Sequence, residues 1–252
     1  TLVGPIQTDI TGFEEITPYK GGWCGNDVWP KIFNAKIRRE LRKMASDLGD
    51  RLYKEGYKGV FCMDFLLDSD DGTPYLGEVN PRISGASPMT NLLTSHYGGV
   101  PLFLFHLLEY LDVDYDIDLR RIQNRWNEYD YWSQLVLKQT EDKVRQLTHA
   151  PKTGVWRMDK YGGIQFDSHD LDWTNVIDND EAFYLQVYKE GDYTYKGADL
   201  GIIVSRGRMQ TEKRELRERA KMWTSAINAE FHGIEPQKVP VFPHDPYKSK
   251  LF

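Results

Sequence analysis

The segment "YLGEVNPRISGASP", residues 75–88, carries an acid, an amide and a guanidinium on alternate positions: Glu78, Asn80 and Arg82. Side-chain direction repeats every two residues along a strand, so Glu78 and Asn80 share one face. A buried strand does not tolerate such a set, because unpaired polar and charged groups are costly to bury. Carboxylate and amide oxygens bind hard metal ions, and a guanidinium binds phosphate or carboxylate oxygens. The residue types therefore indicate a site for metal ions and phosphate.

A predicted hairpin brings a second carboxylate to the same face. The strand-like run "GVFCMDFLL", residues 59–67, is joined to "YLGEVN" by "DSDDGTP", whose Asp-Gly and Pro are typical of a turn. This spacing predicts that Asp64 lies opposite Glu78 and Leu67 opposite Tyr75. Because directly opposed residues of an antiparallel pair project from one face, we expect the two carboxylates to lie close together.

Two carboxylates this close would repel each other, and one would tend to stay protonated unless a cation lay between them. A set of oxygen ligands without His or Cys favours Mg²⁺ or Mn²⁺ over zinc. The sequence therefore predicts Asp64, Glu78 and Asn80 as metal ligands, with a substrate phosphate completing the coordination. Arg82, directly after Pro81, is well placed to bind a phosphoryl or carboxylate oxygen. The alternative is a solvated outer strand face next to an Asp-Gly turn without function.

The runs "CMDFLL" and "YLGEVNPR" resemble the signature of the ATP-grasp superfamily. The resemblance implies that ATP and two magnesium ions bind here, with Asp64 as the first metal ligand, Glu78 as the bridging ligand and Asn80 as the third. It implies that Arg82 stabilises the transferring phosphate or the substrate anion, and that Leu66 packs under the adenine. It also implies a reaction in which a carboxylate attacks the γ-phosphate of ATP to form an acyl phosphate and ADP. An amine or a similar nucleophile then displaces the phosphate.

The resemblance extends, more weakly, to the C-terminal part of the chain. "YKGADLGIIVSRGR" followed by a helix with Trp223 is similar to the C-terminal domain of biotin-carboxylase-like members, although a small sheet packed on a helix would read the same way. Biotin carboxylases place a glutamate base shortly after the arginine, whereas Ser84, Gly85, Ala86 and Ser87 follow Arg82 here. This departure favours a carboxylate–amine or peptide-bond-forming ligase.

A second departure concerns the residues before the hairpin. ATP-grasp enzymes have an N-terminal domain, a glycine-rich loop and phosphate-binding lysines upstream of the metal ligands, and "PYKGGWCGNDV" does not match that loop well. We therefore expect this chain to be the C-terminal half of a longer enzyme and to be inactive by itself. The rest of the enzyme is expected either N-terminal to these residues or on another chain.

The elements that must position the site have an α+β order. Apolar residues at spacings of three and four predict a helix from Pro30, capped by Asn26 or Asp27, to Gly56. Helices are also expected at residues 100–111 and 211–231, and short strands in "SQLVLKQT", "TGVWRMD", "GGIQF", "AFYLQVYK" and "LGIIVS".

These elements predict an antiparallel sheet with packing helices, followed by a smaller α+β domain. Residues 1–111 are interpreted as the C-terminal part of an ATP-grasp nucleotide- and metal-binding domain, with a loop-rich stretch at residues 1–29. Residues 112–233 are interpreted as the small C-terminal domain and residues 234–252 as an extended tail.

A few further residues have two readings. Lys20, Asn26 and Asp27 lie in a glycine-rich segment that closes over a substrate or is a plain turn before a helix. Arg206 and Arg208 follow an apolar strand and either reach an anionic group or are solvated.

Composition limits the function classes. Hydrophobic residues make up 40% and charged residues 28%, and the net charge of -6 gives no sign of nucleic-acid binding. The apolar run "VPLFLFHLLEYL" is too short to span a membrane. With two cysteines the chain has neither a disulfide framework nor a zinc motif, so a cytoplasmic location is expected.

Three functions remain open from the sequence. The first is an ADP-forming ligase, acting on a small-molecule carboxylate and an amine. The second is a nucleotide-binding or regulatory subunit without turnover, and the third is a subunit that completes its active site with another chain. A biotin-carboxylase-like carboxylase component is a further alternative. A homodimer is also left open.

Overall fold

The computed structural model describes residues 1–29 and 31–236. The α-helices are α1 (Ala35–Lys54), α2 (Ser87–His96), α3 (Leu102–Tyr110), α4 (Leu119–Arg125) and α5 (Glu218–Ala229), with short 3-10 helices η1 (Trp126–Glu128) and η2 (Trp173–Asn175). The strands are β1 (Gln7–Thr11), β2 (Trp23–Val28), β3 (Cys62–Leu67), β4 (Pro74–Asn80), β5 (Trp132–Lys138), β6 (Arg145–His149), β7 (Gly154–Met158), β8 (Ile164–Ser168), β9 (Glu181–Gln186), β10 (Tyr193–Thr194), β11 (Asp199–Arg206) and β12 (His232–Ile234). The α+β class predicted from the sequence is confirmed.

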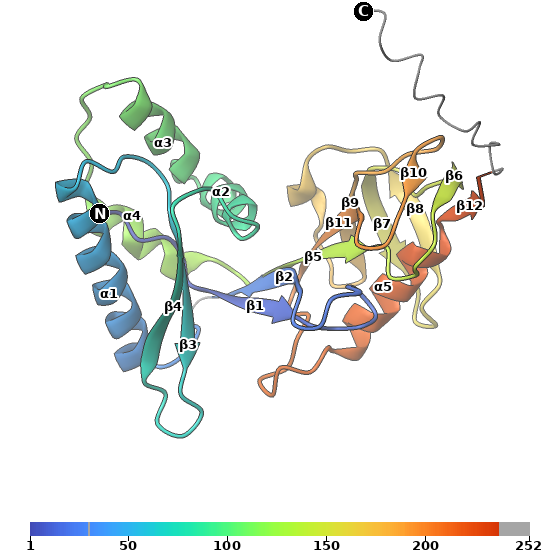
Figure 1. Ribbon diagram of the computed structural model, residues 1–252, viewed down its shortest axis with the longest axis horizontal. Helices are drawn as coiled ribbons and strands as arrows, with labels where there is room; N and C mark the ends of the chain where they lie inside the picture. Colours follow the sequence, from blue (N-terminus) through green and yellow to red (C-terminus); the bar gives the residue numbers. More distant parts are fainter. Residues whose placement is uncertain (30, 237–252) are drawn as a thin grey trace, which may run out of the picture.

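A seven-stranded antiparallel sheet in the order β1-β2-β5-β11-β9-β7-β8 forms the centre of the molecule. The hairpin β3–β4 is a separate two-stranded sheet, and β10, β6 and β12 form a third sheet. Figure 1 shows β1 and β2 running between the part that contains α1 to α4 and the part that contains β6 to β12 and α5. The hairpin β3–β4 stands beside α1 in the first of these parts.

The prediction of a loop-rich stretch at residues 1–29 is wrong, because this segment contains β1 and β2. Gly25, Asn26 and Asp27 made β2 hard to recognise, since these residue types are depleted in strands. They are accommodated because β2 lies between β1 and β5, where Asn26 and Asp27 are fully buried and find polar partners.

The hairpin has the predicted register at its functional end. Asp64 lies opposite Glu78, but a β-bulge follows, so that Phe65 pairs with Leu76 and Leu67 pairs with Pro74. The expected pairing of Leu67 with Tyr75 is therefore wrong by one residue. The bulge leaves Gly77 without a direct partner and adds local twist to the hairpin.

The first helix begins later than predicted. α1 starts at Ala35, and the side chain of Asn34 accepts a hydrogen bond from the backbone N–H of Ile37 at its N-terminus. Asn26 and Asp27 are therefore not its cap, and Pro30 lies outside the described residues. The helix ends at Lys54, two residues before the predicted end at Gly56.

Most of the other predicted helices and strands are present, but their ends differ from the prediction. The expected helix at 100–111 corresponds to α3, and the five expected C-terminal strands correspond to β5, β7, β8, β9 and β11. In addition to β1 and β2, the elements α2, α4, β6, β10 and β12 were not predicted. α5 starts at Glu218 rather than near residue 211 because Gln210 and Leu216 pair across a turn.

Two apolar clusters cover the two faces of the main sheet. On one face Leu135, Leu137 and Ile203 pack against Trp223 and Ile227 of α5. The opposite face is covered by α2 and η2. Met89 and Leu93 of α2 and Trp173 of η2 belong to one apolar cluster with the sheet residues Trp132 and Val204. Because β1 and β2 come from before residue 111, the sheet draws on both sides of the expected domain boundary.

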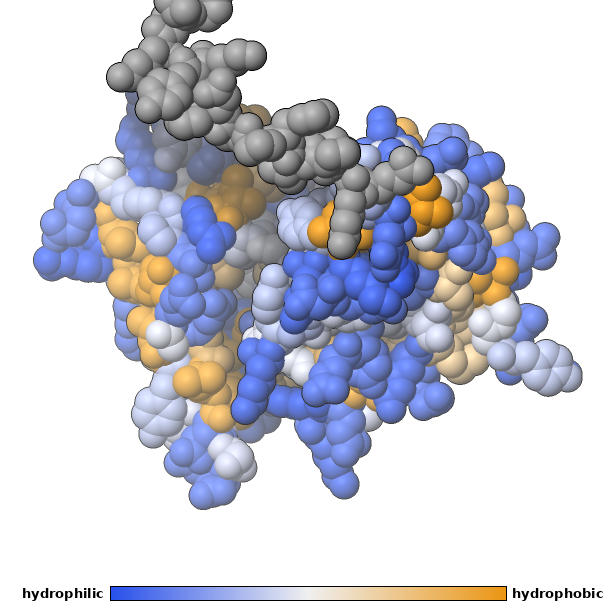
Figure 2. Space-filling model, turned by 45° about the vertical axis from the view of Figure 1, so that its right-hand side comes forward, coloured by the Kyte–Doolittle hydropathy of each residue, from blue (hydrophilic) through white to orange (hydrophobic). Residues whose placement is uncertain are grey.

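The division into 1–111 and 112–233 stays a prediction, and residues 237–252 of the expected tail lie outside the described part. Among the described helices, none has the length and apolarity needed to cross a membrane. Figure 2 shows hydrophobic side chains interspersed with hydrophilic ones over one face of the molecule.

Candidate active site

The hairpin β3–β4 brings the predicted polar residues together. The Nδ2 of Asn80 lies 3.4 Å from the Oδ2 of Asp64, with Asn80 donating, and Glu78 is the direct cross-strand partner of Asp64. Arg82 donates from Nη2 to the Oδ1 of Asn80 at 3.2 Å and from Nη1 to the carbonyl of Ile83 at 3.1 Å. Asp64, Asn80 and Arg82 thus form a continuous polar chain at the end of the hairpin.

Two acids lie close together at the end of the hairpin, and a like charge nearby disfavours ionisation. The pKa of Asp64 is raised, first by burial and then by the negative charge of Glu78, while the Cys62 thiol and Arg82 oppose the shift. A bound cation would relieve this repulsion and allow both carboxylates to ionise.

The donor set fits a divalent cation that is shared with phosphate. Asp64 and Glu78 supply carboxylate oxygens and Asn80 an amide oxygen, which are hard ligands of the type that Mg²⁺ prefers. Within residues 1–29 and 31–236, no group of three or more His, Cys, Asp or Glu side chains is close enough to hold a metal ion. Asp64, Glu78 and Asn80 would leave other positions of such a cation for phosphate or water oxygens.

A cavity of about 1290 Å³ opens beside the hairpin. Asp64, Cys62 and Leu66 line it from β3, and other walls come from residues 1–9, α1, α3 and the segment 208–214. Leu66 exposes 65% of its surface, so an apolar side chain is available for a flat ligand. Glu78, Asn80 and Arg82 are not among the residues that line the cavity and lie beside it on β4 and its continuation.

A third carboxylate, Asp9 of β1, lies close to Asp64 and was missed by the sequence reasoning. Its Oδ1 accepts a hydrogen bond from the Nδ2 of Asn26 at 2.6 Å. Burial raises the pKa of Asp9, and the charge of Asp64 raises it further, while Asn26, Trp23 and Arg214 lower it. The alternation of Gln7 and Asp9 in "QTDIT" was the available signal, and it was hidden by interpreting this segment as a loop.

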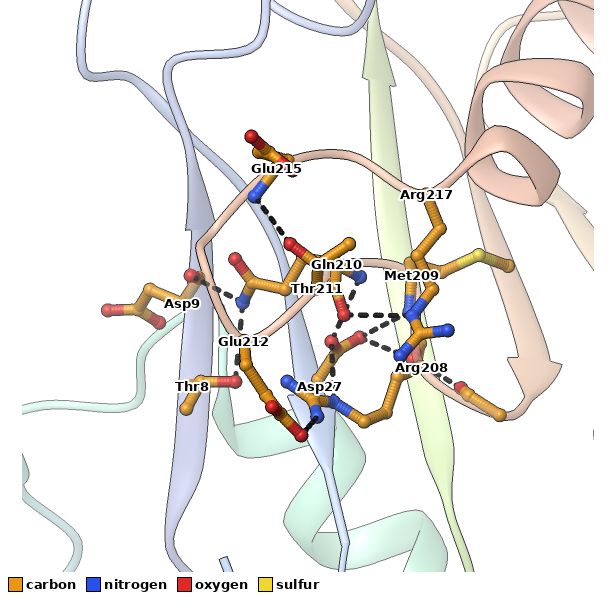
Figure 3. A network of polar contacts seen from close by, with 12 residues as sticks. Thr8, Asp9, Asp27, Arg208, Met209, Gln210, Thr211, Glu212, Glu215 and Arg217 are labelled. Atoms are coloured by element: carbon orange, nitrogen blue, oxygen red, sulfur yellow. Dashed lines mark hydrogen bonds and ion pairs between the residues drawn. The ribbon is translucent and has the colours of Figure 1, made fainter. Parts of the chain in front are cut away.

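The segment that contains Asn26 and Asp27 is part of the rigid sheet and is not a loop that closes over a substrate. Asp27 is fully buried and accepts hydrogen bonds from the Oγ of Ser133 and from the backbone N–H groups of Met209 (2.9 Å) and Gln210 (3.1 Å). Figure 3 shows how this network joins β2 to the residues after β11. Burial raises the pKa of Asp27, and these donors and Arg208 oppose the shift.

The two arginines after β11 have different environments. Arg206 donates from Nε to the carbonyl of Val176 at 2.9 Å, pairs with Asp130 at 3.0 Å and lies over the ring of Trp132. Arg208 lines the cavity, with its guanidinium carbon 3.9 Å from the ring centroid of Trp29.

The fold is similar to that of known enzymes although the sequence is not. No protein-family model matches the sequence, and no curated protein matches it either. Among solved structures, a biotin carboxylase–β,γ-ATP complex from Campylobacter jejuni superposes with a TM-score of 0.53 at 11% identity, over 93% of this chain and 48% of that chain. N5-carboxyaminoimidazole ribonucleotide synthetase from Thermotoga maritima matches over 93% of this chain and 53% of its own, with a TM-score of 0.45 at 10% identity.

The protein therefore spans about half the length of these two solved structures. At this level of identity the likeness concerns the fold alone, and the argument rests on the biotin carboxylase structure, whose TM-score is the higher of the two. Together with the antiparallel sheet and its packing helices, this likeness shows that the chain has an ATP-grasp-like fold.

Proposed function

We propose that this chain is the nucleotide- and metal-binding part of an ATP-dependent, ADP-forming ligase. The observation that carries the proposal is the hairpin, in which Asp64 and Glu78 face each other and Asn80 links Asp64 to Arg82. An ATP-grasp-like fold supports it, because that fold gives such a hairpin a nucleotide context. The cofactor set is ATP with Mg²⁺ or Mn²⁺, and the substrates are a carboxylate and an amine.

The proposed reaction has two displacements. A carboxylate oxygen attacks the γ-phosphorus of ATP, the bond to the bridging oxygen breaks, and ADP leaves. The amine nitrogen then attacks the acyl carbon and loses a proton, and phosphate leaves with the electron pair of the broken C–O bond. A bound metal ion would supply charge neutralisation for the phosphate oxygens.

The residues of this chain have separate tasks in the proposal. Asp64, Glu78 and Asn80 hold the metal ions, and Leu66 contacts the adenine face. Arg82, whose position is fixed by the carbonyl of Ile83 and by Asn80, stabilises the negative charge of the transferring phosphoryl group. The remainder of the nucleotide site would come from the rest of the enzyme.

A biotin-carboxylase-like activity is the second candidate, since the fold is similar to that of the Campylobacter jejuni enzyme. Against it, residues 83–88 contain no acid that could act as a base beside Arg82. A regulatory subunit without turnover would have little use for all four of the residues on the hairpin.

The test is calorimetry of ATP binding to the full-length protein with and without Mg²⁺. We expect weak binding of Mg²⁺ alone and tight binding with ATP, because phosphate oxygens complete the coordination. Glu78→Ala should abolish the magnesium dependence, whereas the control Asp70→Asn, an exposed acid at the tip of the same hairpin, should not. ATP binding that ignores magnesium, or that survives Glu78→Ala unchanged, would contradict the assignment.

A further inference from the structure

Arg208 is a nearly buried cation that lines the cavity. Its side chain is 12% exposed, and its guanidinium group lies on the ring of Trp29. Within the part of the chain that the structure describes, the buried Nε has no hydrogen-bond partner. The nearest carboxylate oxygens are 3.8 Å from Nε, in Asp27, and 3.7 Å from Nη1, in Glu212, both too far for a hydrogen bond.

Neither acid uses the hydrogen-bond donors of this cation, although the buried carboxylate of Asp27 is near enough to interact with its charge. The oxygens of Asp27 already accept a hydrogen bond from the Oγ of Ser133. They also accept hydrogen bonds from the backbone N–H groups of Met209 and Gln210 (Figure 3). The side chain of Glu212 is 90% exposed, and pairs in water contribute little. Asp27 therefore fixes the backbone on which Arg208 stands and leaves the donors of the guanidinium available.

Arg206 shows what a structural arginine looks like in the same region. It also lies over a tryptophan, but it donates to the carbonyl of Val176 and pairs with Asp130, and it does not line the cavity. Arg208 has the same kind of aromatic support without such partners. The difference indicates that Arg208 is kept for a ligand.

The position of Arg208 connects it to the metal-binding hairpin. Both Arg208 and Asp64 line the large cavity. Gln210, two residues after Arg208, donates from Nε2 to the carbonyl of Asp9 at 2.9 Å. Burial and then the charge of Asp64 raise the pKa of Asp9. Thr8 and Asp9 of β1 line the same cavity.

We propose that Arg208, supported by Trp29, is the subsite that receives a carboxylate group of the acid substrate. The planar guanidinium presents paired N–H donors that match the two oxygens of a carboxylate, and stacking on an aromatic ring suits arginine better than lysine. Because the anion is identified as part of a ligase substrate, this inference rests on the proposed function. It extends that function by assigning recognition of the acid to the residues after β11.

The experiment measures anion binding separately from turnover. Full-length protein loaded with Mg²⁺ and ADP is titrated by calorimetry with succinate, with inorganic phosphate and with uncharged glycerol. We expect succinate to bind, and Arg208→Gln to raise its Kd at least tenfold while the affinity for ADP stays unchanged. Arg208→Lys keeps the charge but loses the fork, so it should recover only part of the affinity. Arg206→Gln is the matched control and should bind succinate like the wild type.

Each outcome decides the matter. Equal succinate affinity in the wild type and Arg208→Gln would overturn the subsite, as would failure of the wild type to bind succinate. Binding of phosphate alone would overturn the assignment to a carboxylate. If thermal unfolding shows that Arg208→Gln is not folded, the succinate affinity of Arg208→Lys is compared with that of the wild type instead. Loss of succinate binding in the variant, combined with no ADP release from any acid and amine in a substrate panel, would leave the subsite standing and refute the ligase.

Discussion

At the scale of single residues, the contacts of Arg82 depend on the planar, forked shape of its guanidinium group. It bridges the carbonyl of Ile83 and the amide oxygen of Asn80 through two different nitrogens, which a lysine cannot do. We predict that Arg82→Lys lowers kcat by roughly 10²–10³-fold, the loss typical when one donor to a developing anion is removed.

ATP binding by Arg82→Lys should stay nearly intact, because the role proposed for this residue is in the transition state more than in the ground state. The measurement is ADP release by the full-length enzyme, with calorimetry for ATP affinity. Full activity in Arg82→Ala would reduce this residue to a structural cap at the end of the strand. Formation of AMP and pyrophosphate would rule out acyl-phosphate chemistry altogether.

Asp9 should make the stability of the folded protein depend on pH. Its pKa is raised by burial and by Asp64, so the folded state keeps the proton to a higher pH than the unfolded state does. The stabilising contribution of Asp9 is therefore complete below its ordinary pKa and is lost as pH rises through the raised value. Asp9→Asn keeps an acceptor for Asn26 and removes the charge, so its stability relative to the wild type should increase with pH.

Urea unfolding between about pH 3 and pH 8, in the absence of metal, measures this trend. Asp71→Asn is a control with the opposite sign, because hydrogen bonds from Thr73 lower the pKa of Asp71. The contribution of Asp71 is present above its ordinary pKa and is lost as pH falls, so this variant should lose stability relative to the wild type as pH rises. A pH-independent difference for Asp9→Asn would show that the pKa of Asp9 is not raised in the folded state.

At the scale of elements, β2 depends on one glycine. Gly25 has φ of +154°, and a Cβ added there would lie 2.1 Å from the backbone oxygen of Gln134 on β5. We predict that Gly25→Ala destabilises the protein by about 2–4 kcal/mol, since the backbone of a neighbouring strand has to move. Gly21→Ala is the matched control, because Gly21 also has a positive φ, +72°, but meets nothing within 4 Å.

Urea unfolding of both variants gives the comparison. Gly21→Ala should cost about 1 kcal/mol, the strain of the left-handed conformation alone. Equal effects of the two substitutions would mean that β2 and β5 are not packed as closely as described.

The elements also show what the sequence can and cannot predict. Alternating polar residues and an Asp-Gly turn were enough for the hairpin and for the pairing of Asp64 with Glu78, because both depend on local geometry. The bulge after Asp64 shifted the next pair, since no local signal distinguishes a bulge from a regular ladder at Gly77. β2 was missed because its stability comes from partners distant in sequence: Asp27 is bonded to residues 133, 209 and 210.

α2 was missed for a related reason. The run "SGAS" is typical of a loop, but Pro88 occupies the first turn of the helix, and Met89 and Leu93 are buried against the sheet. Tertiary packing therefore outweighs a weak local preference. The same holds for the candidate site, where the hairpin residues were found from the sequence and Asp9 was not.

At the scale of the whole molecule, the central sheet joins the two parts of the chain. β2 pairs with β5 from Gly25–Leu135 to Val28–Trp132, and Asp27 bonds to Met209 and Gln210 on the far side of the expected boundary. Without β1 and β2, the edge of β5 would expose unpaired backbone groups, and the buried Asp27 network would be lost. The main sheet thus ties β1 and β2 to the segment that follows β11, while the hairpin β3–β4 is a separate two-stranded sheet.

This arrangement gives a prediction about splitting the chain between Leu111 and Asp112. Residues 112–252 expressed alone should not unfold cooperatively, because they lack the two strands that cover β5. Co-expressed with residues 1–111, they should copurify as a complex that regains a cooperative transition and the succinate binding of the intact protein. Urea unfolding and affinity copurification with a tag on either fragment are the measurements. Cooperative unfolding of 112–252 alone, at the midpoint of the uncut protein, would show that the C-terminal part is an independent domain and that β1 and β2 only dock against it.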